Sequence, residues 1–428
     1  MRGLIITTKH ARRGAGYRWT VLFVCWMAFI VVYMGRLGVG PLASFMSSDL
    51  LMTKAQFGLF ASSPSLGIIL VSMPAGWATD RLGVRWVLCF SQVIIGVSLI
   101  ALFIMQSYLA CLIAMFMMGV GHGALFPATG TGIVMWFTAR ERAMALGIQQ
   151  SAVNLGGLLA AVTLPVLAIT YGWRFGFLVM GIIATALGVL SFILYRNPTA
   201  DKSKNCALMS SGVTGMNAVP TCNNSVEKEH SLAALFKSVN IWLLTAAGVC
   251  LIINEFGVFN FFVLYLQEHM AAPMMEACSL LAAVHLGGFF GKPICGVISD
   301  RIFGGRRKHI FMMLGIVATI FTIVLGVLPM GSSQWLMFLC AAIYGFAGVG
   351  WGGIFFAMIG EFAGKERCGV ATGTASGIFA VSVMVGPPLV GHLVDKTGSW
   401  MWFWVCLVFL AATATVLLFF VSEESKRL

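Results

Sequence analysis

The stretch Gly76-Trp-Ala-Thr-Asp80-Arg81-Leu-Gly83-Val-Arg85 is a short charged turn between two long apolar segments, 57–74 and 86–105. A second turn of this kind, Gly296-Val-Ile-Ser-Asp300-Arg301-Ile-Phe-Gly304-Gly-Arg306-Arg307-Lys308, lies 220 residues later, again between apolar segments. Apolar segments of this length cross a membrane as helices, and a tight charged turn joins them outside the hydrocarbon. The repeated turn predicts a chain built from two homologous halves.

The composition is that of a membrane protein. Of the 428 residues, 59% are hydrophobic and only 10% are charged, whereas soluble domains carry roughly a quarter charged residues. The net charge of +12 does not indicate a nucleic-acid partner, because the basic residues lie in short loops between apolar segments. The 11 cysteines are scattered without metal-ligand spacing, so we expect neither a metal nor another cofactor.

Twelve apolar segments predict twelve transmembrane helices, each of roughly 20 residues. The first segment is too long for the apolar core of a signal peptide. Residues 196–239 are polar and predict a flexible cytoplasmic linker, which divides the chain into an N-terminal six-helix bundle (1–195) and a C-terminal one (240–428). The predicted fold is an all-α membrane protein, with two pseudo-symmetric six-helix bundles made of the segments 19–42, 57–77, 86–105, 109–135, 144–168, 174–195, 240–266, 276–299, 309–330, 335–361, 369–394 and 400–421.

The lysines and arginines are unevenly distributed between the two sides of these spans. Lys54, Arg174 and Lys396 lie on one side, and most of the 27 basic residues lie in the loops and tails of the other side. Basic residues are enriched in cytoplasmic loops. This pattern predicts a multi-pass protein of the cytoplasmic membrane, with both termini in the cytoplasm.

The pattern G-x-x-x-D-R-x-G-x-R of the first turn resembles the cytoplasmic loop signature of the major facilitator superfamily. A further repeat supports the likeness, because Tyr171-Gly172-Trp173-Arg174 after span five is echoed by Thr397-Gly398-Ser399-Trp400 after span eleven. The resemblance covers essentially the whole chain. It implies two bundles around a central cavity that give alternating access by rocking. It also implies that the charges of the turns are conformational gating residues, namely Asp80, Arg81, Arg85, Asp300, Arg301 and Arg307.

Ionisable side chains inside apolar spans are costly, so each is a candidate for function. Arg36 and Tyr33 share one helical face of span one, and they are candidates for substrate binding. Alternatively, Arg36 reaches to the outer headgroups of the lipid. Lys292 stands eight residues before Asp300, about 12 Å into its helix. It is a second candidate for binding an anion, or else a structural partner of Glu255.

Three further ionisable residues are candidates for proton coupling. Glu255 in span seven is either a protonatable coupling group or the fixed counter-charge of a deep cation. His122 in span four and His285 in span eight occupy comparable places, and histidine titrates near neutrality. Each histidine can instead be a hydrogen-bonded packing residue.

Neutral polar residues complete the candidate substrate-binding set. Gln150 and Asn154 are one turn apart on one face of span five, and Asn260 lies in span seven. Such groups suit the wall of a solvated cavity, although they also form hydrogen bonds between helices. With Arg36 and Lys292 opposed by one deep anion, the cavity would be positive and would favour an anionic substrate.

Within the superfamily, spans one and four are most similar to the anion:cation symporter and organic-anion porter groups. A first-span arginine binds the substrate carboxylate in those groups, and Arg36 matches it. Their usual acidic residue before this arginine is replaced by Gly35, and the usual proton-carrying glutamate of span four is replaced by His122, before Phe126-Pro127. The resemblance thus leaves His122 or Glu255 as proton carrier, or coupling by another ion or an exchanged anion.

The sequence therefore predicts a secondary active transporter, not an enzyme, that imports a small organic anion, a carboxylate, together with protons. No catalytic triad, phosphate-binding loop or nucleotide motif is present. The expected partners are the anion, protons or another coupling ion and the lipid bilayer, and the expected state is a monomer. The alternatives are a multidrug or metabolite exporter, an anion exchanger, or a receptor that binds without transport. The exporters' glycine-proline signature is absent from span five and Gly386-Pro387-Pro388 occurs in span eleven, which argues against drug export.

Overall fold

The structure is a computed structural model that describes residues 2–138, 141–197, 238–301, 303, 307–329, 332–363 and 368–422. Most of the predicted linker, residues 198–237, lies outside the described residues. The linker and the exact domain boundaries therefore stay predictions.

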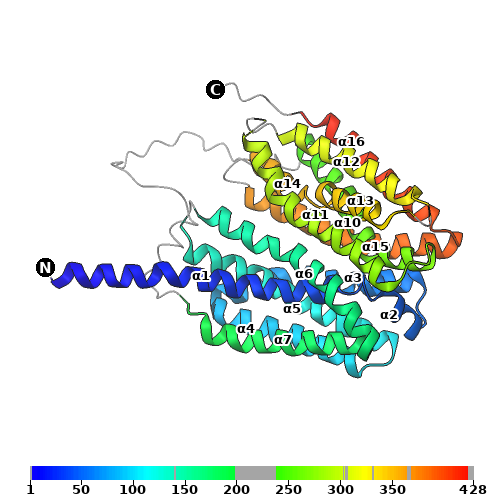
Figure 1. The fold of residues 1–428 in the computed structure, drawn as a ribbon. Coiled ribbons are helices and arrows are strands. Elements are labelled where there is room, and N and C mark those ends of the chain that lie inside the picture. Colours follow the sequence, from blue (N-terminus) through cyan, green and yellow to red (C-terminus); the bar gives the residue numbers. More distant parts are fainter. Residues whose placement is uncertain are drawn as a thin grey trace.

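The described part of the N-terminal half is entirely helical apart from short connections (Figure 1). Its helices are α1 (Arg2–Leu37), α2 (Ala43–Asp49), α3 (Lys54–Leu82), α4 (Val84–Ile104), α5 (Tyr108–Trp136), α6 (Arg142–Tyr171) and α7 (Trp173–Leu194). At the first predicted turn, α3 ends at Leu82 and α4 begins at Val84, so only Gly83 lies between the two helices. The backbone angle φ of Gly83 is 83°. Glycine adopts this left-handed backbone readily, so the sequence folds back here from α3 to α4.

The C-terminal half repeats this plan. Its helices are α10 (Val239–Glu268), α11 (Met274–Arg301), α12 (Arg307–Val327), α13 (Gln334–Gly348), α14 (Gly352–Ala363), α15 (Cys368–Thr397) and α16 (Met401–Phe420). Lengths correspond between the halves, with 29 and 28 residues in α3 and α11, 21 in both α4 and α12, and 30 in both α6 and α15.

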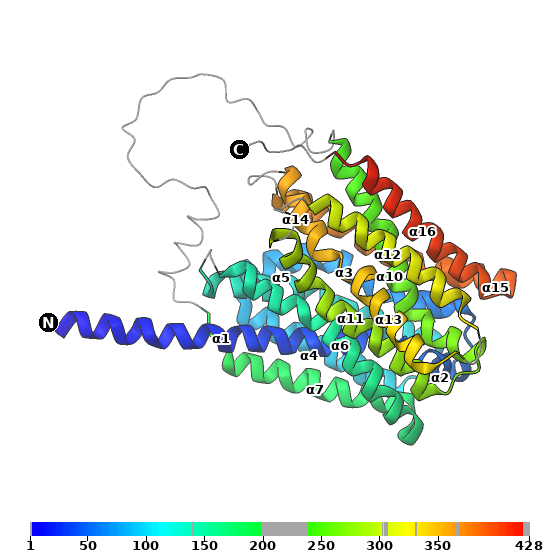
Figure 2. The same cartoon turned by 45° about the horizontal axis from the view of Figure 1, so that its top comes forward.

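Helix packing repeats as well. In the N-terminal half, α3 packs against α5 and α4 packs against α5 and α7. In the C-terminal half, α11 packs against α13 and α12 packs against α13 and α16. Figures 1 and 2 show the two halves as neighbouring bundles of roughly parallel helices. Within the described residues, twelve helices are long and apolar enough to cross a membrane. The predicted fold class, twelve spans in two six-helix bundles, is confirmed.

Two predicted segments are cut short or interrupted by turns that contain glycine. The first span ends at Leu37, five residues early, and residues 38–42 form a turn before the short helix α2. The tenth span is broken at residues 349–351, between α13 and α14. Glycines surround both breaks (Gly38, Gly40, Gly348 and Gly350); glycine weakens a helix and lets other backbone approach closely. Broken helices inside a membrane are tolerated where protein or a cavity surrounds them.

The two halves contact each other chiefly through α3 with α15 and through α6 with α11. We call the end of the molecule that carries Lys54, Glu268 and Asp395 the Lys54 end, and the opposite end, with Asp80 and Arg301, the Asp80 end. At the Lys54 end, a Cβ atom on Gly58 would lie 2.5 Å from the carbonyl oxygen of Pro387 in α15.

The same helix faces are uncovered toward the Asp80 end. Gly76 follows Gly58 by about five helical turns and shares its face, yet no atom lies within 4 Å of a Cβ placed there. In α11, Gly296 follows His285 by about three turns and is equally uncovered, whereas His285 contacts Gly157 of α6. The halves therefore meet at the Lys54 end and diverge toward the Asp80 end.

Candidate binding site between the two halves

Arg36 lies in the last turn of α1 and is buried between the two halves, with 8% of its surface exposed. One of its terminal nitrogens, Nη2, donates a hydrogen bond of 3.0 Å to Ser65 Oγ of α3. Its guanidinium carbon lies 5.1 Å from the ring centre of Phe256 in α10, at cation–π distance. The nitrogen Nε is buried and has no hydrogen-bond partner among the described residues. Arg36 is thus buried inside the protein.

Tyr33 and His122 form the wall beside Arg36 in the N-terminal half. Their rings lie 5.0 Å apart in an edge-to-face arrangement, and Phe29 packs against both. His122 on α5 is 2% exposed, and its Nδ1 atom has no hydrogen-bond partner in the described structure. The charge of Arg36 acts on both Tyr33 and His122. The predicted residues of spans one and four are therefore neighbours.

Glu255 and Lys292 form the charged group of the C-terminal half. Glu255 on α10 is buried, and Lys292 lies on α11 near enough for the two charges to attract each other. Their separation exceeds that of a direct ion pair, since none joins them among the described residues. Trp351, at the break between α13 and α14, lies beside Glu255, but its indole N–H has no well-formed hydrogen bond.

Asn154 and His285 lie where α6 crosses α11. A Cβ atom on Gly288 would be 3.2 Å from the amide nitrogen of Asn154, and the His285 ring contacts Gly157 and lies 4.4 Å from the ring of Phe259. Both polar side chains are fully buried, and within the described residues neither makes a hydrogen bond. Buried polar groups are normally paired with protein or water, so this crossing retains unused hydrogen-bonding capacity.

The remaining polar candidates lie apart from each other. Gln150 shares the face of Asn154 but is exposed, because it lies one turn nearer the Asp80 end, where the halves diverge. Asn260 is buried in α10 beside the backbone of Gly40, and its Nδ2 atom is unpaired among the described residues. The structure therefore groups Arg36, Tyr33 and His122 on one side and Glu255, Lys292 and His285 on the other.

Among the side chains that the structure describes, the gating candidates of the first turn do not join the halves in this conformation. Asp80 and Arg81 are exposed, and Arg81 lies over the ring of Trp77 in its own helix. Arg85 donates to the carbonyl oxygen of Phe192 at 2.6 Å, within the N-terminal half.

The gating candidates of the second turn behave similarly. Arg307 pairs with Glu361 at 3.0 Å, within the C-terminal half. Arg301 is exposed at the end of α11, and the side chain of Asp300 lies outside the described residues. The gating role of all six residues stays a prediction.

Sequence reasoning missed Ser65 and Phe256, and it did not predict the helix break at which Trp351 lies. A serine and a phenylalanine inside apolar spans carry no signal of their own, since only packing brings them to Arg36. The break could have been found from the stretch Gly348-Val-Gly350-Trp-Gly352-Gly353, because such a glycine cluster predicts a break in the helix.

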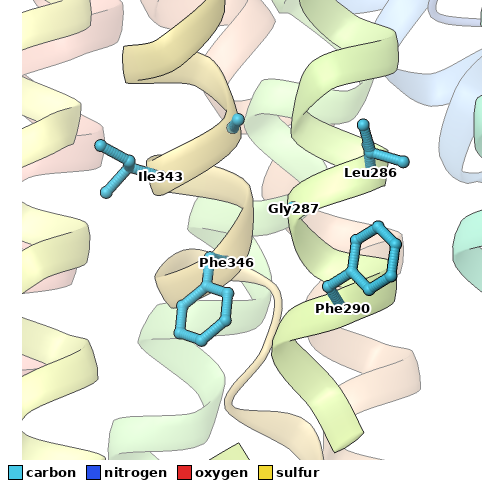
Figure 3. Close-up of a pocket in the computed structure, with 6 residues that line it drawn as sticks. Leu286, Gly287, Phe290, Ile343 and Phe346 are labelled. Atoms are coloured by element: carbon cyan, nitrogen blue, oxygen red, sulfur yellow. The ribbon is translucent and has the colours of Figure 1, made fainter. Parts of the chain in front are cut away.

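An apolar pocket lies between α11 and α13, away from the face of α11 that carries His285 and Lys292 (Figure 3). It is lined by Leu286, Gly287 and Phe290 of α11 together with Ala342, Ile343 and Phe346 of α13. Because Leu286 and Phe290 lie on the helix face opposite to His285 and Lys292, this pocket is separate from the polar groups between the halves.

Comparison with known proteins gives the family. The model of the Major Facilitator Superfamily matches residues 25–367 and 305–428. A probable sulfoacetate transporter of Cupriavidus necator is 23% identical over 389 residues, covering 90% of this chain and 89% of that protein. A hexuronate transporter of Bacillus subtilis is 21% identical, covering 89% and 88%.

A membrane sensor protein of Salmonella typhimurium is also similar, with 24% identity over 99% of this chain and 96% of that protein. Among solved structures, a D-xylose-proton symporter superposes with a TM-score of 0.76 at 14% identity, covering 96% of this chain and 99% of that chain. Its likeness supports the fold alone. With the family match spanning most of the chain and twelve spans in two repeated bundles, the protein belongs to the Major Facilitator Superfamily.

Proposed function

We propose that the protein is a secondary transporter that imports a small organic anion, a carboxylate, and that Arg36 binds the anionic group. The observation that carries this proposal is the burial of Arg36 between the two halves with an unpaired Nε. A buried guanidinium without a complete set of acceptors is unfavourable unless a ligand or water supplies them. A carboxylate supplies two oxygens in the spacing that a guanidinium binds best.

The deep charges and the relatives support the same substrate class. Arg36 and Lys292 are opposed only by Glu255 in the interior of the described spans, so this region is net positive. The similar proteins include a probable sulfoacetate transporter and a hexuronate transporter, and both substrates are organic anions. Their substrates also provide specific compounds for a first screen.

Alternating access follows from the arrangement of the halves in this proposal. The halves meet at the Lys54 end and diverge at the Asp80 end. If the Asp80 end faces the cytoplasm, as the distribution of basic residues predicts, this conformation is open to the inside. Rocking of one bundle against the other would then expose Arg36 to the outside.

Proton coupling is assigned to the same interior groups. Glu255 is buried near Lys292. Protonation of its carboxyl group would remove this nearby negative charge, and Lys292 would then attract an anion more strongly. His122 and His285 carry buried, unpaired ring nitrogens in the described structure and are the other candidates for carrying a proton.

The proposal is tested with purified protein in a thermal-shift screen and with the same protein in liposomes. Sulfoacetate, D-glucuronate, D-glucarate and a lipophilic cation are the probes, because a ligand of the folded state raises the melting temperature. We expect stabilisation by an anion that is lost in Arg36→Ala and reduced in Arg36→Lys, which keeps the charge but not the planar fork. Arg196→Ala, at an exposed arginine, is the control and should behave as wild type.

Two results would overturn this reading. Stabilisation only by the lipophilic cation would favour an exporter. If Arg36→Ala binds the anion as well as the wild-type protein does, Arg36 does not bind the anionic group. In liposomes, accumulation of the anion driven by an inward proton gradient tests the coupling, and Glu255→Gln and His122→Gln identify the proton carrier.

A membrane sensor is the second candidate, and the similarity to the sensor of Salmonella typhimurium favours it. A sensor would bind an anion in the thermal-shift assay and show no uptake or exchange in liposomes. Counterflow of a labelled anion therefore separates the two functions.

A further inference from the structure

Arg36 is carried by α1, and its contacts come from two other helices, one in each half of the molecule. Its own helix, α1, and the hydrogen-bonding Ser65 on α3 belong to the N-terminal half, whereas Phe256 on α10 belongs to the C-terminal half. The serine accepts a hydrogen bond at one edge of the guanidinium, and the phenyl ring lies at cation–π distance from its central carbon. Two groups, one from each half, thus restrict the position of one side chain.

These contacts leave a defined part of the guanidinium for a ligand. The fork carries five N–H donors, of which one is used by Ser65. The buried Nε has no partner in the described structure. Nη2 carries two N–H groups, and Ser65 accepts from one of them. When the Nη2–H beside Nε–H is the one left over, a carboxylate or sulfonate can accept from both at the same time, which is the strong bidentate arrangement.

We infer that Ser65 and Phe256 are positioning residues that clamp the Arg36 guanidinium so that its Nε side is presented to the anionic group of the substrate. This inference rests on the proposed role of Arg36 as the anchor. Neither residue needs to touch the substrate. Ser65 sets the orientation of the fork in its plane, and Phe256 sets the position of that plane.

The clamp has a consequence for the transport cycle. Arg36 and Phe256 belong to different halves, and the turn after α1 also approaches α10, since a Cβ atom on Gly40 would overlap the backbone of Phe259. Separation of the halves at the Lys54 end would therefore remove the phenyl ring from Arg36. The substrate anion would then meet a fully clamped guanidinium only while the Lys54 end is closed.

A purely structural role is the competing explanation for Ser65, since a buried guanidinium needs acceptors whether or not it binds a ligand. The two roles differ in what they change. A structural residue affects the melting temperature of the ligand-free protein, whereas a positioning residue affects the dissociation constant for the anion.

The experiment measures both quantities for an isosteric pair, Ser65→Thr and Ser65→Val, with sulfoacetate and D-glucuronate as the probes. Threonine keeps the hydroxyl group and valine lacks it, although their shapes match. We expect Ser65→Thr to bind within about twofold of wild type and Ser65→Val to bind about tenfold more weakly, as for loss of a hydrogen bond to a charged group. The matched control is Ser63→Ala, because the Ser63 hydroxyl donates only to the Phe60 carbonyl of its own helix, at 2.8 Å.

A second pair tests the aromatic contact. Phe256→Tyr keeps the ring and should retain affinity, whereas Phe256→Leu should weaken binding by roughly three- to tenfold, the range of a partly desolvated cation–π contact. Phe290→Leu, at an exposed phenylalanine of the separate apolar pocket, is the control and should bind as wild type.

The outcomes separate the clamp from the anchor. If Arg36→Ala abolishes binding while Ser65→Val and Phe256→Leu bind as wild type, the clamp is wrong and the anchor stands. A lower melting temperature of Ser65→Val with an unchanged dissociation constant also overturns the clamp, in favour of the structural role. If the wild-type protein binds neither anion, both the proposed substrate class and the clamp are wrong.

Discussion

The two ends of the molecule carry similar charged residues but use them differently. At the Lys54 end, the Lys54 ammonium lies 3.1 Å from Glu268, and this ion pair joins the N-terminal half to the C-terminal half. At the Asp80 end, the ion pairs among the described residues, Arg18 with Glu141 and Arg307 with Glu361, stay within one half. Among the described residues, charge therefore joins the two halves at the Lys54 end.

Backbone groups take part in the closed end as well. Asp395 of α15 accepts hydrogen bonds from the N–H groups of Lys54 and Ala55, at 3.0 and 2.8 Å, and Thr53 accepts from Gln56. The first N–H groups of a helix lack partners in their own helix and attract negative charge. The first turn of α3 is thus completed by a carboxylate from the other half.

Glycines make this approach possible. A Cβ atom on Gly391 would overlap the backbone of Lys54, and one on Gly58 would lie against Pro387. Small residues let membrane helices approach closely. Closure of this end can be measured as the distance between spin labels at Ser48→Cys and Met401→Cys, in a cysteine-free background, because both positions are exposed near the Lys54 end.

The largest effect is expected for Gly58→Leu. Its side chain has no space against Pro387, and overpacking costs about 1–3 kcal/mol or more, so the label distance should lengthen in most molecules and transport should be lost. Gly76→Leu is the control, since it lies on the same face in open space, and it should keep the short distance. A short distance in Gly58→Leu would contradict the packing described for this end.

Asp395→Asn should have the next largest effect. Asp395 accepts with both carboxylate oxygens, Oδ1 from Lys54 and Oδ2 from Ala55. Asparagine has a single oxygen acceptor, so the variant loses one of these hydrogen bonds and the charge that strengthens both. We expect the closed population to lose about 1–2 kcal/mol of free energy, seen as a mixture of short and long label distances. Lys396→Gln, at the exposed neighbouring residue, should leave the distances unchanged; an equal effect there would attribute closure to general charge.

Glu268→Gln should have a smaller effect. The Lys54–Glu268 pair is partly exposed, and such pairs contribute about 1 kcal/mol or less. Trp400 donates its indole N–H to Glu268 at 3.1 Å, and a glutamine can still accept that bond. Raising the salt concentration should weaken the wild-type closure and leave the variant unaffected. A larger effect than that of Asp395→Asn would reverse the proposed order.

The smallest effect is expected at the Asp80 end, for Glu361→Gln. Loss of its pair with Arg307 removes a contact inside the C-terminal half, so thermal stability should fall by about 1 kcal/mol or less. The label distance at the Lys54 end should not change. A changed distance would show that the two ends are coupled through this pair.

Much of the fold was predictable because the bilayer restricts it. The length of the apolar segments predicted twelve spans, and the two charged turns, at matching places in each half, predicted the repeat. The structure and the family confirm both predictions. The breaks at residues 38–42 and 349–351 were not predicted. Hydropathy does not register them, since the apolar composition continues through the glycines of both breaks.

The sequence predicted which residue types belong to the candidate site, but it did not predict which of these residues lie next to each other. The cost of burying charge drew attention to Arg36, Glu255, Lys292 and the histidines. Gln150 and Asn154 share a helix face, yet one is exposed and the other is buried, because the halves begin to diverge between them. Ser65 and Phe256 became candidates only through their contacts with Arg36.

The sequence by itself determined the membrane location, the spans, the repeat and the few deep charges, because each follows from local hydropathy and the cost of burying polar groups. Only the tertiary structure decided which residues meet across the halves, such as Arg36 with Phe256 and Asp395 with the first turn of α3. These contacts join residues more than 200 positions apart in the chain. They depend on how two rigid bundles pack against each other, which no local pattern in the sequence encodes.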